Sequence, residues 1–211
     1  MRLIFASNNA HKLAEVQAIM PAGVEVVSLR EVGFVDEIDE TGSTLEENSL
    51  IKAETVWNWV RENGVQADGV FADDTGLEIA VLDGAPGVYT ARWAYLEPSL
   101  LEDATCPLRE MELYAANRRK ALWMLEGKTN RKAQFRTVIT WIKADGQQLQ
   151  VDGVVRGTMT TEERGEGGFG YDSIFVPEGY DRTFAELPAE TKNSISHRAR
   201  ALEALVRELE K

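Results

Sequence analysis

Residues 2–20, RLIFASNNAHKLAEVQAIM, determine the class of this fold. Residues 2–6 form a short apolar run that is typical of a buried strand. The polar turn Ser7-Asn8-Asn9 follows, and its side chains suit the N-cap of a helix. Apolar residues then recur over residues 12–20 at a spacing compatible with a helix. The chain therefore opens as strand, polar turn and helix, the alternation of an α/β protein.

The rest of the chain continues to mix strand and helix patterns. Further strands are expected over residues 24–29, 69–72, 77–82, 135–142, 147–155 and 171–176. Helices are expected after the capping box that begins at Thr44, over residues 108–126, and from Ser194 to the end of the chain. No repeat, low-complexity tract or long linker interrupts them. These patterns predict the α/β class with a mixed sheet.

Length and composition favour one large domain, or one domain with two lobes around a cleft. The chain has 211 residues, of which 44% are hydrophobic and 27% are charged. Its lone cysteine, Cys106, excludes an internal disulfide and fits a reducing compartment. Cys106 lies in a polar stretch without a neighbouring histidine, which indicates a bystander rather than a nucleophile.

Charge and hydropathy exclude several partners. The only apolar run at the N-terminus, residues 3–6, is too short for a signal peptide or a membrane span. We therefore expect a cytoplasmic protein that does not bind membranes. The formal net charge of −12 would repel a nucleic-acid backbone. An acidic protein with a few well-placed cations can still bind a small polyphosphate together with a metal ion.

Two segments could bind an anion. Residues 7–12 place small polar side chains and Lys12 at a helix N-terminus, where free backbone N–H groups favour phosphate. Taken alone, that segment indicates an ordinary N-cap beside a surface lysine. The second segment, residues 192–198, brings Lys192, His197 and Arg198 to the start of the last helix. Cations are unfavourable there, so their presence favours an anionic partner over a helix start that merely tolerates charge.

Acidic residues in two segments could bind a metal ion. Asp73 and Asp74 follow an apolar strand, and α/β folds place ligands at strand ends. Magnesium takes one or two carboxylates together with substrate phosphates. An Asx-turn between two strands is equally compatible with this pair. Glu40, with Lys52 on the next helix, could contribute a further ligand, although its spacing alone indicates a solvated acid in an acidic loop.

A glycine-rich loop covers residues 165–172. It contains the spacing G-x-G-x-x-G, but a strand pattern follows it instead of a helix, which excludes a dinucleotide-binding fold. Phe169 and Tyr171 in this loop could hold a base by stacking. A flexible hairpin connection is the alternative.

Taken in chain order, these segments resemble the inosine triphosphate pyrophosphatase family, also called dITP/XTP pyrophosphatases. The resemblance spans nearly the whole chain, except that the stretch between Tyr95 and Lys132 carries no motif residue. The motifs that carry it are Ser7-x-Asn9-x-x-Lys12, Glu40-Thr-Gly42, Ala72-Asp-Asp-Thr-Gly76, Gly84-Ala-Pro-Gly87, Gly167-Gly-Phe-Gly-Tyr-Asp172 and Ser196-His-Arg198.

This resemblance implies a fold, a reaction and a cofactor. The fold would be an elongated mixed sheet with flanking helices and two lobes around a central cleft, in a single domain over residues 1–211 that forms a homodimer. The reaction would be hydrolysis of the triphosphates ITP, dITP and XTP to the monophosphate and pyrophosphate, with Mg²⁺. Alternatives are a magnesium-dependent phosphatase that releases orthophosphate, a non-catalytic purine nucleotide-binding protein, and a structural α/β domain.

The resemblance also implies roles for individual residues. Asp74 would accept the proton and, with Glu40, bind the metal, while Lys12 and Lys52 would stabilise phosphate charge. His197 and Arg198 can donate hydrogen bonds to the 6-oxo group of hypoxanthine or xanthine, which adenine lacks. The residues implied to bind substrate are Ser7, Asn8, Asn9, Ala10, His11, Lys12, Thr75, Phe169, Gly170, Tyr171, Asp172, Lys192, His197 and Arg198.

Overall fold

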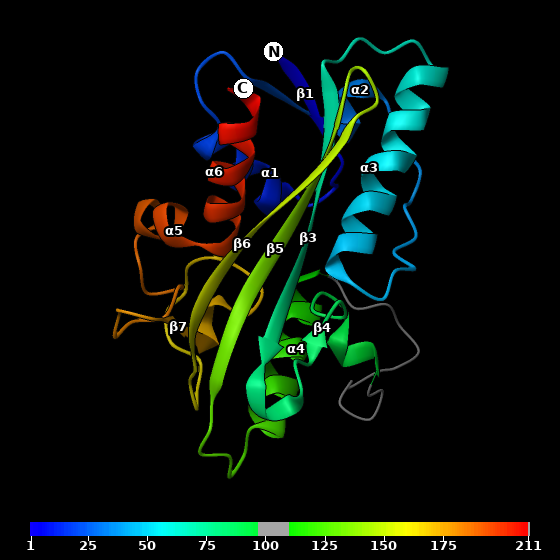
Figure 1. Ribbon diagram of the computed structural model, residues 1–211. Coiled ribbons are helices and arrows are strands. Elements are labelled where there is room, and N and C mark those ends of the chain that lie inside the picture. The colour runs from blue at the N-terminus through cyan, green and yellow to red at the C-terminus, as the bar shows by residue number, and fades with distance from the viewer. Residues whose placement is uncertain (97–109, 211) are drawn as a thin grey trace. The chain divides into compact units, whose positions relative to one another are not determined.

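A computed structural model of the chain describes residues 1–96 and 110–210 (Figure 1). Strands and helices alternate along it, and the strands pair in both parallel and antiparallel fashion. The predicted α/β class with a mixed sheet and flanking helices is therefore confirmed. Cys106 and residues 108–109 of a predicted helix lie outside the described residues.

The strands and helices have the following bounds. The strands are β1 (Arg2–Phe5), β2 (Glu25–Ser28), β3 (Gly69–Ile79), β4 (Pro86–Gly87), β5 (Lys132–Lys143), β6 (Gln148–Met159) and β7 (Phe175–Pro177). The helices are α1 (Ala10–Ile19), α2 (Leu29–Val32), α3 (Leu45–Glu62), α4 (Glu110–Met124), α5 (Ala189–Ile195) and α6 (His197–Leu209). None of the helices in this described part of the chain combines the length and the apolar character that crossing a bilayer requires.

One predicted strand boundary is wrong. The polar residues 73–76 were expected to end the strand over 69–72, but β3 runs on without a break to Ile79. The strand continues because Asp73 and Asp74 find cationic partners on neighbouring elements and need no turn to reach water. Only residues 77–79 of the strand predicted over 77–82 are extended, since residues 80–82 form a 3₁₀ turn.

Two other predictions near the C-terminus also need correction. The strand predicted over 171–176 is a 3₁₀ turn at residues 172–174 followed by β7. The single helix predicted from Ser194 is two helices, because Ser196 leaves the helical conformation and caps α6. Its hydroxyl accepts a hydrogen bond from the Ala199 backbone N–H at 3.1 Å, so the chain restarts a helix with His197 in its first turn.

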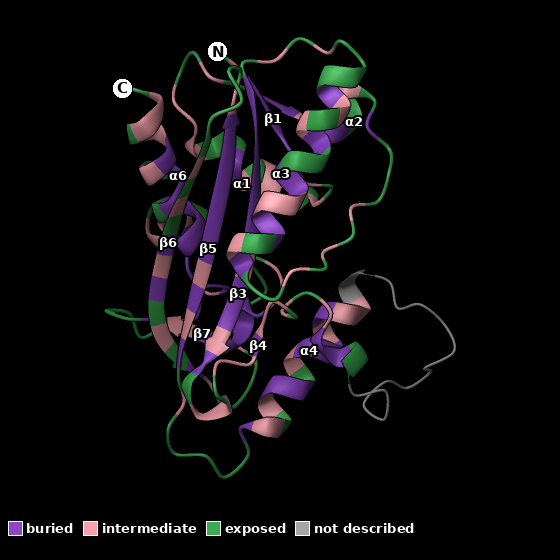
Figure 2. Cartoon of the chain, turned by 45° about the vertical axis from the view of Figure 1, so that its right-hand side comes forward, coloured by how far each residue is buried: buried purple, intermediate pink, exposed green. Residues whose placement is uncertain are grey.

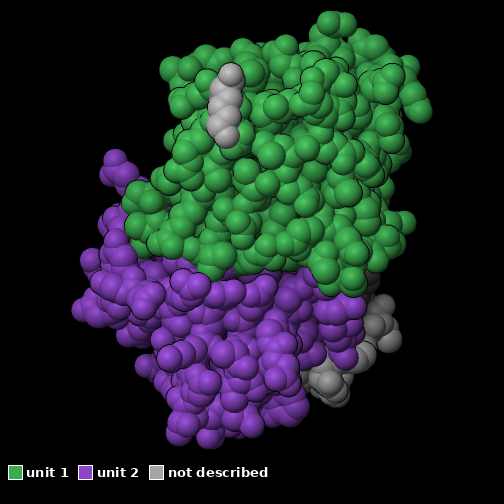
Figure 3. Space-filling model, viewed as in Figure 1, with its two compact units in different colours: residues 1–75, 136–154, 193–211 green, residues 76–135, 155–192 purple. Residues whose placement is uncertain are grey.

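The chain divides into two compact units (Figure 3). The first unit comprises residues 1–75, 136–154 and 193–211, and its strand order is β2-β1-β3-β5-β6. The second comprises residues 76–135 and 155–192. It contains the continuations of β3, β5 and β6, with β4 antiparallel to β3 and β7 antiparallel to β6.

Two apolar clusters cover opposite faces of the sheet in the first unit. On one face, Leu3, Phe5 and Phe71 pack with residues of α1 and α6. On the other face, Ile4 and Val70 pack with residues of α2 and α3. Side chains alternate between the two faces of a strand, and both β1 and β3 are buried along this stretch (Figure 2). The alternation assigns each residue of β3 to one helical layer or the other.

The second unit has an aromatic core of its own. The rings of Phe135 and Phe175 meet edge to face at 4.8 Å between centroids. Phe184 stacks on Phe175 with 5.4 Å between the ring centroids. Offset and edge-to-face contacts of this kind add to the free energy of burial. They anchor the short strand β7 directly after the glycine-rich loop.

Gly153 in β6 lies in close contact with the backbone of α6. A Cβ atom at this position would lie 2.2 Å from the His197 carbonyl oxygen and 2.3 Å from the Ala201 backbone nitrogen. Both neighbours are backbone atoms of α6, which cannot rotate away. Gly153 therefore allows α6 to pack directly on β6.

We expect Gly153→Ala to lower the free energy of unfolding by about 3 kcal/mol, because α6 as a whole must move to admit the methyl group. Urea unfolding monitored by circular dichroism measures this change. The control is Gln148→Ala, at an exposed position of the same strand, which should change stability by less than about 0.5 kcal/mol. Equal stabilities for Gly153→Ala and the wild type would show that the contact is loose.

Candidate functional site

The two adjacent carboxylates of β3 point to opposite faces of the sheet. Asp73 shares the side of Phe71, which packs against α1 and α6. Asp74 shares the side of Val70 and Ala72, which pack against α3. Both carboxylates are buried. The strand therefore presents one acid to each helical layer.

Asp73 lies between two buried cations. Its Oδ1 accepts a hydrogen bond from Lys12 Nζ of α1 at 2.9 Å, and its Oδ2 accepts one from Arg198 Nε of α6 at 3.0 Å. Arg198 also donates from Nη1 to Glu15 and from Nη2 to Thr75 at 3.4 Å. The guanidinium thus bonds to three different side chains. We call the set Lys12, Glu15, Asp73 and Arg198 the Asp73 network.

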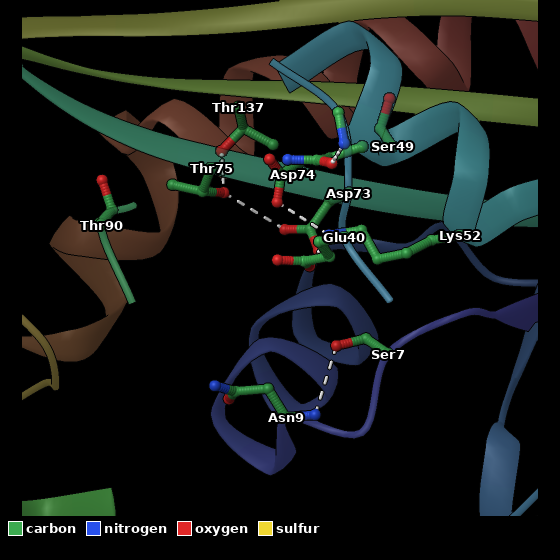
Figure 4. Close-up of polar contacts among 12 residues, drawn as sticks. Ser7, Asn9, Glu40, Ser49, Lys52, Asp73, Asp74, Thr75, Thr90 and Thr137 are labelled. Atoms are coloured by element: carbon green, nitrogen blue, oxygen red, sulfur yellow. Dashed lines mark hydrogen bonds and ion pairs between the residues drawn. The ribbon is translucent and has the colours of Figure 1, made fainter. Parts of the chain in front are cut away.

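Asp74 and Glu40 share a single ammonium group. Lys52 Nζ, on α3, donates to Asp74 Oδ1 at 2.8 Å and to Glu40 Oε1 at 2.6 Å (Figure 4). Glu40 comes from the loop before α3, and Asp74 comes from the middle of β3. Three segments far apart in the sequence therefore meet at Lys52. We call Glu40, Lys52 and Asp74 the Lys52 cluster.

The pKa values of the two aspartates shift in opposite directions. Burial alone would raise the pKa of Asp73, but Lys12 and Arg198 outweigh it and hold that pKa well below its usual range. Burial raises the pKa of Asp74, and Lys52 offsets this only in part. Asp73 is therefore a fixed anion, whereas Asp74 takes up a proton more readily than an ordinary aspartate.

The turn before α1 lies beside this site. Asn9 caps the helix, since its Oδ1 accepts a hydrogen bond from the Lys12 backbone N–H at 3.1 Å. The Asn9 backbone N–H donates to Ser7 Oγ at 3.3 Å (Figure 4). β1 ends at Phe5, paired with Phe71 of β3. Residues 7–12 therefore leave the sheet next to Asp73, with the helix N-terminus that favours an anion.

A second group of predicted site residues gathers in the second unit. Asp172 Oδ2 accepts hydrogen bonds from Lys192 Nζ at 2.6 Å and from the Phe169 backbone N–H at 2.8 Å. The Lys192 ammonium lies 4.8 Å from the centre of the Phe169 ring. A Cβ at Gly168 would lie 2.1 Å from Asp172 Oδ2, so only glycine lets the loop close around this carboxylate.

Arg118 of α4 holds the same loop from outside the motifs. Its Nη1 donates to the Gly170 carbonyl at 3.0 Å, and its Nε donates to Glu163 Oε2 at 2.8 Å. Tyr171 adds a hydrogen bond from its hydroxyl to the Thr90 carbonyl at 2.9 Å, and burial raises the pKa of that hydroxyl. Arg118 lies in a stretch without motif residues, and no local pattern identified it.

The predicted residues thus divide between the two units. The first unit holds Ser7, Asn8, Asn9, Ala10, His11, Lys12, Glu40, Lys52, Asp74, Thr75, His197 and Arg198. The second unit holds Phe169, Gly170, Tyr171, Asp172 and Lys192. In the first unit Lys52 contacts Glu40 and Asp74, and in the second unit Lys192 contacts Asp172. Glu15, which binds Arg198, is a member of the first group that sequence analysis missed.

A cavity of about 620 Å³ in the second unit contains none of these residues. Its lining includes Glu78, Arg156 and Tyr180. Volume alone does not make it the functional site, because the buried charges and shifted pKa values lie elsewhere.

The Lys52 cluster fits a divalent cation. Asp74 Oδ2 is buried and accepts no hydrogen bond from the residues that the structure describes. Those residues contain no group of three or more His, Cys, Asp or Glu side chains able to hold a metal by themselves. Magnesium needs no such cage, since it takes one or two carboxylates and completes its shell with phosphate oxygens and water. Glu40 and Asp74 can supply the carboxylates.

We expect effects of very different size on the free energy of unfolding from neutralising the two aspartates. Asp73→Asn should cost about 3–5 kcal/mol at pH 7, because it leaves Lys12 and Arg198 without their shared anion. Asp74→Asn should change stability by less than about 1 kcal/mol, since Lys52 keeps Glu40 and burial already disfavours the charge of Asp74.

Urea unfolding at several pH values checks both substitutions. The lowered pKa of Asp73 means that its contribution is present above roughly pH 4 and is lost as the pH falls toward that lowered value. Asp73→Asn should lack this part of the acid sensitivity. Equal destabilisation by the two variants would contradict the division between a fixed anion and a readily protonated acid.

Comparison with known proteins places the chain in one family. The sequence model of the Ham1 family matches residues 3–208. The dITP/XTP pyrophosphatase of Porphyromonas gingivalis is 46% identical over 205 residues, which cover 97% of this chain and 95% of that protein. The corresponding protein of Flavobacterium johnsoniae is 41% identical over 206 residues, covering 98% and 96%.

Solved structures agree. The Ham1 protein of Staphylococcus aureus aligns with a TM-score of 0.80 and 35% identity, covering 100% of this chain and 98% of that one. A HAM1 protein from Coxiella burnetii aligns with a TM-score of 0.80 and 36% identity, covering 99% of this chain and 98% of that one. The chain therefore belongs to the Ham1 family.

Proposed function

We propose that this chain hydrolyses nonstandard purine nucleoside triphosphates, namely ITP, dITP and XTP, to the monophosphate and pyrophosphate, and so cleanses the nucleotide pool. The observation that carries this proposal is the Lys52 cluster, in which Asp74 has a raised pKa and an oxygen that accepts no hydrogen bond from the described residues. The names of full-length relatives, which are dITP/XTP pyrophosphatases, support it. The reaction class is a nucleoside triphosphate pyrophosphatase.

Glu40 and Asp74 would hold Mg²⁺ in this proposal. Their two carboxylates share one cation, the Lys52 ammonium. When both are ionised, the cluster therefore has an excess negative charge, which favours binding of a second cation. When bound, the ion would neutralise charge on the phosphates and acidify water.

Asp74 would act as the proton acceptor. Water attacks the α-phosphorus, the bond to the leaving pyrophosphate breaks, and the proton of the water passes to the Asp74 carboxylate. A general base works best when its pKa is near the working pH, and burial moves the pKa of Asp74 in that direction. Asp73 is unsuited to this role because Lys12 and Arg198 lower its pKa.

Lys12, Lys52 and the turn over residues 7–12 would stabilise the triphosphate. Cations placed where charge develops on the leaving group lower the barrier. Both lysines form ion pairs with carboxylates, Lys12 with Asp73 and Lys52 with Glu40 and Asp74. Backbone N–H groups at the start of α1 would add donors, and Thr75 would contact the substrate beside them.

The nucleoside would lie against Phe169, Gly170, Tyr171, Asp172 and Lys192, with His197 and Arg198 donating to the 6-oxo group. The Phe169 ring offers a stacking surface, and Lys192 and Asp172 fix it. Arg198 would release its longest bond, the 3.4 Å contact with Thr75, to reach a base. ATP would leave these donors unpaired, and such mismatches reach factors on the order of ten thousand.

We also propose that the chain works as one two-lobed domain, as a homodimer, in the cytoplasm. Its partner would be the free nucleotide rather than nucleic acid or a membrane, and the net charge of −12 supports this. Light scattering of the purified protein tests the dimer, and a monomer mass would overturn that part.

Product analysis tests the reaction. The purified protein is incubated with Mg²⁺ and, in separate reactions, with ITP, XTP, ATP and GTP, and pyrophosphate and orthophosphate are assayed in parallel. We expect pyrophosphate from ITP and XTP and little product from ATP and GTP. Orthophosphate in place of pyrophosphate would indicate the phosphatase alternative. No product from any nucleotide would indicate a binding protein.

Asp74→Asn should lower kcat by about 100- to 10,000-fold with a smaller change in KM, because it removes the proton acceptor. The matched control is Glu62→Gln, an exposed acid on α3, which should keep wild-type kinetics. Wild-type turnover in Asp74→Asn would remove Asp74 from this role.

Arg118→Met tests the loop of the second unit. Loss of its hydrogen bond to the Gly170 carbonyl should loosen the loop and raise KM for ITP roughly tenfold or more, with little change in kcat. The control is Arg119→Met, the exposed neighbour on α4. A change in kcat alone, or none in either constant, would contradict a role in holding the loop.

A further inference from the structure

The loop that carries Glu40 is tied to α3 at two points. Lys52 Nζ binds the Glu40 carboxylate at 2.6 Å. Asn48 Oδ1 accepts a hydrogen bond from the Gly42 backbone N–H at 2.8 Å. Asn48 and Lys52 are four residues apart on α3, so they lie one turn apart on the same face of the helix. One face of α3 therefore contacts the loop at Glu40 and at Gly42.

The fit at Gly42 is tight. A Cβ atom there would lie 2.7 Å from Asn48 Oδ1 and 2.7 Å from Glu47 Cβ. The loop backbone thus rests directly on the first turns of α3, and no side chain can be inserted between them. The position of Glu40, two residues earlier, depends on this contact.

The amide nitrogen of Asn48, Nδ2, takes no part in the contact with Gly42. Because the Gly42 N–H is a donor, the atom facing it must be the oxygen, which leaves Asn48 Nδ2 as the other end of the amide. Asn48 is fully buried, and its Nδ2 donates to no acceptor among the described residues. A buried donor without a partner costs about 1–3 kcal/mol, so an acceptor from outside the chain would relieve a real penalty.

The Lys52 cluster also contains a buried acceptor that receives no hydrogen bond from the described residues. Asp74 Oδ2 is the other buried oxygen of the Lys52 cluster and accepts no hydrogen bond from the described residues. The next residue on α3, Ser49, contrasts with this pair, because its buried hydroxyl bonds to Thr140 at 2.6 Å. Asn48 and Asp74 thus each have a buried polar atom without a hydrogen-bond partner among the described residues, whereas the buried hydroxyl of Ser49 has one.

We propose that Asn48 has two functions in the reaction. Its Oδ1 positions the Glu40 loop for cation binding, and its Nδ2 donates a hydrogen bond to an oxygen of the bound triphosphate. This inference rests on the proposed function of the same site. The side chain needed is an amide, because an acid has the acceptor but not the donor, and an alkyl group has neither.

Two variants separate the two functions. Asn48→Ala removes both, whereas Asn48→Asp keeps an acceptor for Gly42 and loses the donor. Binding of Mn²⁺ to the nucleotide-free protein, measured by electron paramagnetic resonance of free Mn²⁺, reports on the loop. Steady-state kinetics with ITP report on the donor.

Asn48→Ala should weaken Mn²⁺ binding by about 10- to 100-fold, the usual effect of losing a residue that orients a metal ligand. Asn48→Asp should bind Mn²⁺ at least as tightly as the wild type but lose about tenfold or more in kcat/KM. Ser49→Ala is the control: it loses a buried bond without touching the loop and should keep wild-type Mn²⁺ affinity.

Each function can fail separately. Wild-type Mn²⁺ affinity in Asn48→Ala would overturn the positioning role, and wild-type kcat/KM in Asn48→Asp would overturn the donor role. If Asn48→Ala does not fold, Gly42→Ala disturbs the same contact from the loop side and must reproduce the loss of Mn²⁺ binding. Absence of pyrophosphate from the wild type would instead overturn the proposed function, and the Mn²⁺ measurement is independent of it.

Discussion

The buried carboxylate of Asp73 joins the parts of the first unit that matter for its chemistry. It binds Lys12 of α1 and Arg198 of α6, and Arg198 in turn binds Glu15 of α1. A buried ammonium or guanidinium is tolerated only with an anionic partner. The turn before α1 and the start of α6 are therefore fixed against β3 by charge, on top of the apolar packing of both helices. Without this anion Lys12 would lose the carboxylate that it binds, and Arg198 would depend on Glu15 for its counter-charge.

The pleat of one strand places two adjacent acids in different environments. Asp73 and Asp74 are neighbours in the chain, yet each faces a different helical layer and a different set of cations. Two cations around Asp73 keep it ionised, while Asp74 shares one ammonium with Glu40 and is dominated by burial. Environments that push two pKa values apart are a general means of assigning acid and base roles. Here the two environments follow from the alternation of side chains along β3.

Local patterns were enough to predict the class of the fold and most strands, whereas the roles of the motif residues came from the resemblance to a family. The unbroken course of β3 could not be predicted, because consecutive acids read as a turn unless their partners are known. Those partners come from far along the chain: Arg198 is 125 positions from Asp73. Glu15 lies three residues after Lys12, one helical turn away, and that spacing could have identified it. Arg118 had no such signal, since it meets its loop 52 positions later. What a sequence lacks here is the pairing of charges across elements.

Lys52 supplies an internal counter-charge to the two acids that are proposed to bind a metal ion. The ion pairs of the Asp73 network and the Lys52 cluster join three cations, Lys12, Lys52 and Arg198, to four carboxylates, Glu15, Glu40, Asp73 and Asp74. The carboxylates proposed to hold an ion thus already share a tethered counter-charge, which offsets their mutual repulsion. Many small metal-binding domains fold only when their metal binds. In this chain the Lys52 ammonium of α3 supplies a counter-charge from within the fold, so the pairing of Glu40 and Asp74 around a cation does not itself depend on a divalent ion.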